Sequence, residues 1–127
     1  MAKVVSILVV DDDESMLEYC TYILAVYGFE VTPAATGNQV LEQLKSKIFD
    51  VVLTDHVTVD ARGTSVIKAV KATQPGAEII VMSGIPTLEN AAASYLAGAR
   101  AYLAKPFSLE QLRTAVLKCL DSKAPVR

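Results

Sequence analysis

The chain has 127 residues, of which 52% are hydrophobic and 20% are charged, and its formal net charge is −2. These values are typical of one folded domain with a substantial apolar core, and they exclude an intrinsically disordered chain. No block of Lys or Arg is present, so neither nucleic-acid binding nor attraction to an anionic membrane is predicted. The apolar runs are too short to span a bilayer. Four acidic residues directly after the first apolar run argue against a signal peptide, so we expect a cytoplasmic protein.

The chain opens with a predicted strand, helix and second strand. Residues 4–10 form a nearly continuous β-branched run, which predicts a strand that is covered on both faces. From residue 14 to residue 27 the apolar residues follow helical spacing, and Gly28 is a typical helix stop. Residues 29–32 alternate between apolar and polar, which predicts a short strand.

The middle of the chain repeats this alternation. Thr36 and Gln39 have the spacing of a capping box, which predicts the start of a second helix. The apolar side of that helix is predicted to be Val40, Leu41 and Leu44. The apolar run at 50–55 predicts a third strand. A third helix should then present Val66, Ile67 and Val70 and end at Gln74-Pro75-Gly76.

The last third of the chain adds two strands and two helices. Residues 78–82 and 101–104 predict strands, separated by an alanine-rich helix over 88–97 that Gly98 closes. Ser108 and Gln111 predict a second capping box for the last helix. The apolar side of this helix is predicted to be Leu109, Leu112, Val116 and Cys119.

Five strand–helix units in regular alternation predict an α/β domain with a parallel sheet and helices on both faces. Periodicity alone does not give the strand order. We expect the domain to cover residues 1–121, and residues 122–127 to be a tail or the start of a linker. Cys20 and Cys119 lack metal-ligand spacing and fall on apolar helix faces, so they are expected to be buried thiols; a disulfide between them is the less favoured alternative.

Polar residues stand at the carboxyl ends of four of the five predicted strands. Asp11 and Asp12 follow the first strand, Asp55 ends the third, Ser83 follows the fourth, and Lys105 follows the fifth. The carboxyl ends of parallel strands share one edge, which is where ligands bind in open α/β sheets. Clustered carboxylates repel one another unless a cation neutralises them, and hard oxygen ligands suit Mg²⁺ or Mn²⁺. The edge therefore predicts a divalent ion together with a phosphate-like ligand.

Each of these residues also has a simpler interpretation. The acids at 11–14 could only cap the first helix, whose positive end favours negative charge. That interpretation leaves the polar residues of the other strand ends unexplained. Taken singly, Ser83 could be a turn residue, Tyr102 a strand aromatic that only packs, and His56 an ordinary surface histidine.

Taken together and in order, these residues resemble the receiver domain of two-component response regulators, over about residues 4–120. The resemblance is carried by Val9-Val10-Asp11-Asp12, Asp55 with Gly63 eight residues on, Ser83-Gly84, and Tyr102 followed by Lys105-Pro106-Phe107. It implies a single flavodoxin-like (βα)5 domain with strand order 2-1-3-4-5. It also implies a phosphoacceptor that catalyses only its own phosphorylation and dephosphorylation, and is otherwise not an enzyme.

The resemblance implies a role for each site residue. Asp55 would accept the phosphoryl group, Lys105 would pair with that group, and the hydroxyl of Ser83 would bind one of its oxygens. Mg²⁺ would be held by Asp11, Asp12, Asp55 and the backbone carbonyl of Val57. Gly84 would keep Asp55 accessible, and the Lys105-Pro106 peptide would be cis.

The resemblance also implies a switch and partners. On phosphorylation Tyr102 would turn inward, and the face made by the fourth helix, fifth strand and fifth helix would become the output surface. The donor would be a sensor histidine kinase or a phosphotransfer protein, and the target an attached output domain or a separate protein. Direct nucleic-acid or membrane binding is not expected, and a homodimer formed on phosphorylation is a further alternative.

The chain departs from the family pattern at two places. Thr58-Val59 stands where the family commonly has Met-Pro, and Ile85-Pro86 follows Ser83-Gly84, where the proline should restrict the loop. His56, next to Asp55, is a hypothetical tuner of phosphoryl lifetime.

Two other functions compete with this one. A haloacid-dehalogenase-like phosphatase would need a second Asp two residues after Asp55, where this chain has Val57. A receiver-like interaction module that never carries phosphate would usually lack the acidic pair, the acceptor or the lysine, and all of these are present.

Overall fold

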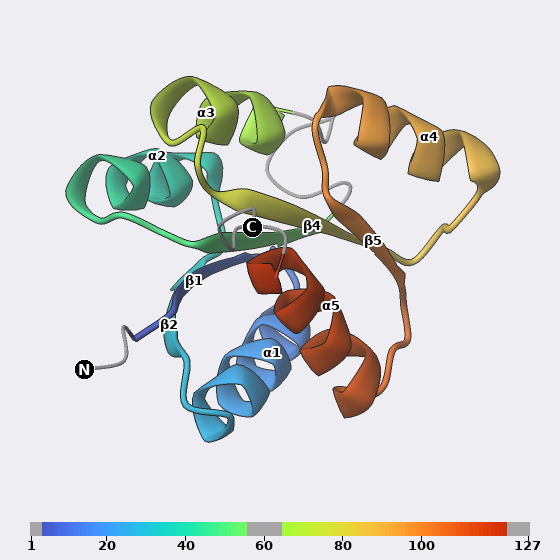
Figure 1. Ribbon diagram of the computed structural model, residues 1–127, viewed down its shortest axis with the longest axis horizontal. Helices are drawn as coiled ribbons and strands as arrows, with labels where there is room; N and C mark the ends of the chain where they lie inside the picture. Colours follow the sequence, from blue (N-terminus) through green and yellow to red (C-terminus); the bar gives the residue numbers. More distant parts are fainter. Residues whose placement is uncertain (1–3, 56–64, 122–127) are drawn as a thin grey trace.

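Strands and helices alternate along the part of the chain that the computed structural model describes, residues 4–55 and 65–121 (Figure 1). The strands are β1 (Ser6–Val10), β2 (Glu30–Ala34), β3 (Val51–Asp55), β4 (Glu78–Ser83) and β5 (Ala101–Ala104). The helices are α1 (Glu14–Val26), α2 (Gly37–Ser46), α3 (Ser65–Thr73), α4 (Leu88–Ala97) and α5 (Leu109–Asp121).

The strands form one parallel sheet in the order β2-β1-β3-β4-β5. This confirms the α/β, flavodoxin-like fold and its strand order. All residues of β1 and β3 are buried, which explains why their apolar runs are continuous rather than alternating. Edge strand β2 carries Pro33, which an edge tolerates because one side of the strand needs no ladder hydrogen bond.

Helices cover both faces of the sheet. In Figure 1, α1 and α5 lie on one face, and α2, α3 and α4 lie on the other. Successive side chains of a strand point to opposite faces, so Leu8 and Val10 of β1 pack under α2 and α3, while Ile7 and Val9 pack against α1 and α5. The result is two apolar cores separated by the sheet.

The capping box predicted for α5 is complete, and the one predicted for α2 is present in part. At α5 the bonds are reciprocal: the Ser108 hydroxyl accepts the Gln111 N–H at 3.1 Å, and the Gln111 side chain accepts the Ser108 N–H at 2.8 Å. At α2 the Thr36 hydroxyl accepts the Gln39 N–H, but the Gln39 side chain reaches one residue further back, to the N–H of Ala35. These bonds satisfy N–H groups that the first turn of a helix leaves unpaired.

Element boundaries differ from the prediction by a few residues. The second strand runs on to Ala34, and the first begins only at Ser6. The side chains of Leu41 and Leu109 are 45% and 41% exposed, so their assignment to the buried sides of α2 and α5 was wrong. On α2 the stripe facing the core consists of Val40 and Leu44, one turn apart, and Leu41 lies outside it.

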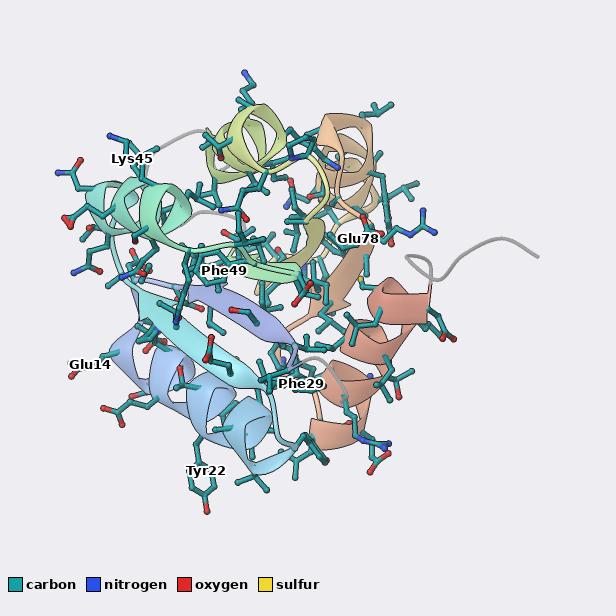
Figure 2. The ribbon with its side chains drawn as sticks, turned by 60° about the vertical axis from the view of Figure 1, so that its left-hand side comes forward. Glu14, Tyr22, Phe29, Lys45, Phe49 and Glu78 are labelled. Atoms are coloured by element: carbon teal, nitrogen blue, oxygen red, sulfur yellow. The ribbon has the colours of Figure 1, made fainter. Side chains whose placement is uncertain are left out.

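Large side chains show the layering. Phe49, between α2 and β3, is 2% exposed and packs in the core beneath α2, whereas Tyr22 points away from the sheet on the outer side of α1 (Figure 2). Cys20 and Cys119 are both buried and unbridged, as predicted. In the described part of the chain, no helix is long and apolar enough to cross a membrane.

Candidate functional site

The predicted site residues lie at the carboxyl ends of four strands, on the same edge of the sheet. Asp11 and Asp12 directly follow β1, Asp55 ends β3, Ser83 ends β4, and Lys105 directly follows β5. The register pairs the last residue of β1 with the last but one of β3, and the last residue of β4 with the last of β5. The side chains therefore meet although up to 94 residues separate them in the sequence.

Lys105 joins the two buried carboxylates of this edge. Its Nζ lies 2.9 Å from Oδ2 of Asp11 and 3.1 Å from Oδ1 of Asp55. The side chains of Asp11, Asp55 and Lys105 are 0%, 8% and 17% exposed. The Lys105 N–H also donates to the carbonyl of Ser83 at 2.7 Å, and the Lys105-Pro106 peptide is cis, as the family pattern implied.

Burial, hydrogen bonds and neighbouring charges all shift the pKa values of Lys105 and Asp11. Burial alone lowers the pKa of Lys105, but hydrogen bonds and charge from Asp11 and Asp55 outweigh it and raise that pKa above 10.5. Burial raises the pKa of Asp11 above 3.8, and the charge of Asp55 adds to this rise. The hydrogen bonds from the Asp13 N–H and from Lys105 work against that rise without cancelling it. One ammonium faces two buried carboxylates, so the site could take a second cation.

The donor atoms of the site fit a divalent ion. Asp11, Asp12 and Asp55 each offer one carboxylate oxygen, and these oxygens lie within 4.8 Å of one another. Asp12 is exposed, so the cluster opens to solvent on one side and an ion could keep part of its water shell. An all-oxygen, negatively charged set suits Mg²⁺ or Mn²⁺ better than it suits softer metals.

Ser83 is buried next to these groups, with 1% of its surface exposed. Its Oγ accepts the N–H of Ile85 at 3.0 Å. The next residue, Gly84, is exposed, and a Cβ added there would meet nothing within 4 Å. Space around this position therefore does not require glycine, and the expected role of Gly84 in keeping Asp55 accessible stays a prediction.

Tyr102 lies on β5 and pairs with Val81 of β4, two register positions before Ser83. Its ring packs against the core beneath α2, α3 and α4, and its hydroxyl is buried without a hydrogen-bond partner among the described residues. The inward turn on phosphorylation that the family pattern implies stays a prediction.

Several predicted features lie outside the described residues. These are His56, the Val57 carbonyl, the Thr58-Val59 departure and Gly63. Conversely, one contact near the site had no signal in the sequence: the side-chain amide of Asn90 donates to the carbonyl of Ile85 at 2.7 Å. An asparagine in the first turn of a helix is common, so only the folded loop reveals this bond.

Comparison with known proteins agrees with the fold. The sequence model of the response regulator receiver domain family matches residues 7–117 of this chain. The transcriptional regulatory protein ZraR of Salmonella typhimurium is 34% identical over 116 residues, which cover 91% of this chain and 26% of ZraR. The DNA-binding transcriptional regulator NtrC of Azospirillum brasilense is 35% identical over 120 residues, which cover 94% of this chain and 25% of NtrC. The chain thus spans about a quarter of the length of these two relatives.

Among solved structures, the crystal structure of a CheY-like response regulator receiver domain protein from Methanospirillum hungatei JF-1 is similar along nearly the whole chain. It is 35% identical, superposes with a TM-score of 0.87, and the match covers 95% of this chain and 97% of that one. The family model, the relatives and the fold therefore agree, and the chain belongs to the response regulator receiver domain family.

Proposed function

We propose that Asp55 accepts a phosphoryl group from a phosphohistidine, carried by a sensor histidine kinase or a phosphotransfer protein, in a reaction that needs Mg²⁺. The observation that carries this proposal is the Lys105 ammonium bridging Asp11 and Asp55, with Asp12 beside them. Asp55 is thus a carboxylate in contact with a buried ammonium and close to two further carboxylates that could hold a metal ion. Phosphoryl transfer depends on such positioning and charge neutralisation.

In this reaction an oxygen of Asp55 forms a bond to phosphorus, the bond between phosphorus and the donor histidine breaks, and its electron pair stays on the imidazole nitrogen. Lys105 stabilises the negative charge that spreads over the phosphoryl oxygens. Bound at Asp11, Asp12 and Asp55, a divalent ion would neutralise further charge. Later attack by water on phosphorus restores the Asp55 carboxylate and releases phosphate. The domain would catalyse only these two reactions of its own side chain.

The signal would leave through the face of α4, β5 and α5. Phosphorylation adds negative charge and acceptor oxygens at Asp55, toward which Ser83 and Lys105 can be drawn. The backbone bond from Lys105 to Ser83 connects these two residues directly. Tyr102 and Leu103 line a cavity of about 610 Å³ on this face, together with residues of α4 and α5.

The partners follow from the family. The matched relatives are transcriptional regulators about four times longer than the aligned segment, which supports an output domain or a separate target protein downstream of this chain. The sequence has a net charge of −2 and no block of Lys or Arg, so any DNA contact would belong to the output partner. A cytoplasmic location and a homodimer formed on phosphorylation are part of the same proposal.

Intact-mass measurement after incubation with Mg²⁺ and acetyl phosphate tests the proposal. We expect one phosphoryl group on the wild type, none on Asp55→Asn, and none when EDTA replaces Mg²⁺. Asp13→Asn is the matched control, because asparagine caps a helix as well as aspartate does and the variant removes a neighbouring charge. Phosphorylation that persists in Asp55→Asn would contradict the assignment. If the protein hydrolyses excess acetyl phosphate and no phosphorylated protein is detected, the result would instead favour a phosphatase.

A further inference from the structure

A chain of hydrogen bonds links Ser83 to the first turn of α4. The Ser83 hydroxyl accepts the N–H of Ile85 at 3.0 Å. The carbonyl of Ile85 accepts two hydrogen bonds, from the side-chain amide of Asn90 at 2.7 Å and from the N–H of Thr87 at 2.9 Å. Ile85 is 64% exposed, so these bonds rather than packing hold it in place.

Asn90 is itself fixed by the helix. Thr87 is the N-cap of α4, and its hydroxyl accepts the N–H of Asn90 at 3.1 Å. The hydroxyl of Ser94, a buried residue one turn further on, donates to the carbonyl of Asn90 at 2.9 Å. The Asn90 side chain therefore projects from a firmly held backbone, and its amide N–H can hold Ile85 against the start of α4.

The hydroxyl of Ser83 has an unused hydrogen. A serine hydroxyl carries one hydrogen and two lone pairs, and the bond from Ile85 engages a lone pair. Among the described residues nothing accepts the hydrogen, although Ser83 is only 1% exposed. A buried donor without an acceptor is unfavourable. The unused hydrogen of Ser83 is therefore available to an acceptor oxygen at the edge of the sheet where Asp55 lies.

We propose that Asn90 is a positioning residue for phosphoryl binding: it holds Ile85, and Ile85 holds the Ser83 hydroxyl ready to donate to a phosphoryl oxygen on Asp55. Asn90 itself touches neither the phosphoryl group nor the metal-binding oxygens. The inference rests on the proposed function and adds to it a residue of α4 through which the helix and the phosphorylation site affect each other.

Beryllofluoride, which mimics the phosphoryl group on an aspartate, provides the test. We would titrate it into ¹⁵N-labelled protein at saturating Mg²⁺ and follow the amide signals. Asn90→Asp keeps the size of the side chain and suits the first turn of a helix, but it cannot donate to Ile85. Loss of one hydrogen bond, worth about 1 kcal/mol net, should weaken beryllofluoride binding about three- to tenfold. Asn90→Ala removes the same donor without adding charge and should weaken binding similarly.

Two comparisons separate this role from charge and from helix stability. Asn38→Asp adds the same charge to the first turn of α2 and should leave beryllofluoride affinity unchanged. In a Ser83→Ala background, Asn90→Asp should have less than about a twofold further effect, because Asn90 acts through Ser83. An undiminished effect in that background, or equal affinities of wild type and both Asn90 variants, overturns the role of Asn90. A wild type that does not bind beryllofluoride overturns the proposed function itself.

Discussion

The ammonium of Lys105 lies 3.1 Å from a carboxylate oxygen of Asp55, and the same ammonium lies 2.9 Å from Asp11. The residue proposed to stabilise the transferred phosphoryl group is therefore already bound to the proposed nucleophile. Asp11 and Asp55 are also two of the three residues whose oxygens fit a divalent ion. Lys105 and the ion would share the carboxylates of Asp11 and Asp55, so each should weaken the binding of the other.

Replacing Lys105 with methionine should reveal this competition. Without a divalent ion, removal of the cation leaves two buried carboxylates without compensation, and the free energy of unfolding should fall by about 3 kcal/mol. Mg²⁺ should then stabilise the variant more than it stabilises the wild type, because the ion no longer meets a positive charge. Urea unfolding with EDTA and with Mg²⁺ measures both effects. Lys118→Met, on the exposed side of α5, is the control. Equal stabilisation of Lys105→Met and wild type by Mg²⁺ would show that the two cations do not compete.

The sequence predicted most of the fold because the central strands are buried on both faces. Their apolar runs are continuous, and the capping box at Ser108 and Gln111 marks the start of α5. The site could be predicted because parallel strands end at one edge. Strand order came only from the family resemblance, since periodicity carries no information about which strands pair. Side-chain bonds to backbone outside a helix or strand have no periodic pattern and were not predicted. Examples are the bond of Gln74 to Phe49 and that of Asn90 to Ile85.

Gln74 illustrates such a bond network. The sequence suggested only that it helps end α3, yet its buried side chain accepts the N–H of Phe49 at 2.8 Å and donates to the carbonyls of Leu44 and Lys47 at 3.0 and 2.6 Å. Gln74→Leu keeps a similar volume but leaves these backbone groups without their partner. We expect a loss of about 2–4 kcal/mol in the free energy of unfolding, measured in urea.

The control for this prediction is Gln43→Leu, at a half-exposed position of α2, which should change the free energy of unfolding by less than about 0.5 kcal/mol. A Gln74→Leu variant as stable as this control would mean that water or rearranged backbone replaces the three bonds.

The burial of Asp11 should make the free energy of unfolding depend on pH in the absence of metal. Burial raises its pKa in the folded state above the value of 3.8 expected for the unfolded chain. Between these two pKa values the folded protein binds more protons than the unfolded chain, so the contribution of Asp11 to stability falls as pH rises through that window. The free energy of unfolding of the wild type, minus that of Asp11→Asn, should therefore decrease as the pH rises from about 4 in EDTA.

Urea unfolding of both proteins at several pH values gives this difference. With Mg²⁺ present, the stability difference between wild type and Asp11→Asn should instead increase with pH, because the ion binds the ionised carboxylate. Mg²⁺ should also stabilise Asp11→Asn less than it stabilises the wild type. A difference that grows with pH in EDTA would mean that the hydrogen bonds from Lys105 and the Asp13 N–H outweigh burial.

Tyr102 carries a buried hydroxyl that has no hydrogen-bond partner among the described residues. Tyr102→Phe keeps the ring that packs against the core and removes only this hydroxyl. Without phosphoryl group or metal, the variant should be as stable as the wild type or up to about 1 kcal/mol more stable. Tyr22→Phe, where the side chain is 69% exposed, should show no change in the same urea experiment. A loss of more than about 1 kcal/mol in Tyr102→Phe would show that the hydroxyl has a partner.

The proposed switch adds a second expectation for the same variant. If Tyr102 moves on activation to a position where its hydroxyl is hydrogen-bonded, only the activated wild type gains that bond. Beryllofluoride should then abolish any excess in the free energy of unfolding of Tyr102→Phe over the wild type.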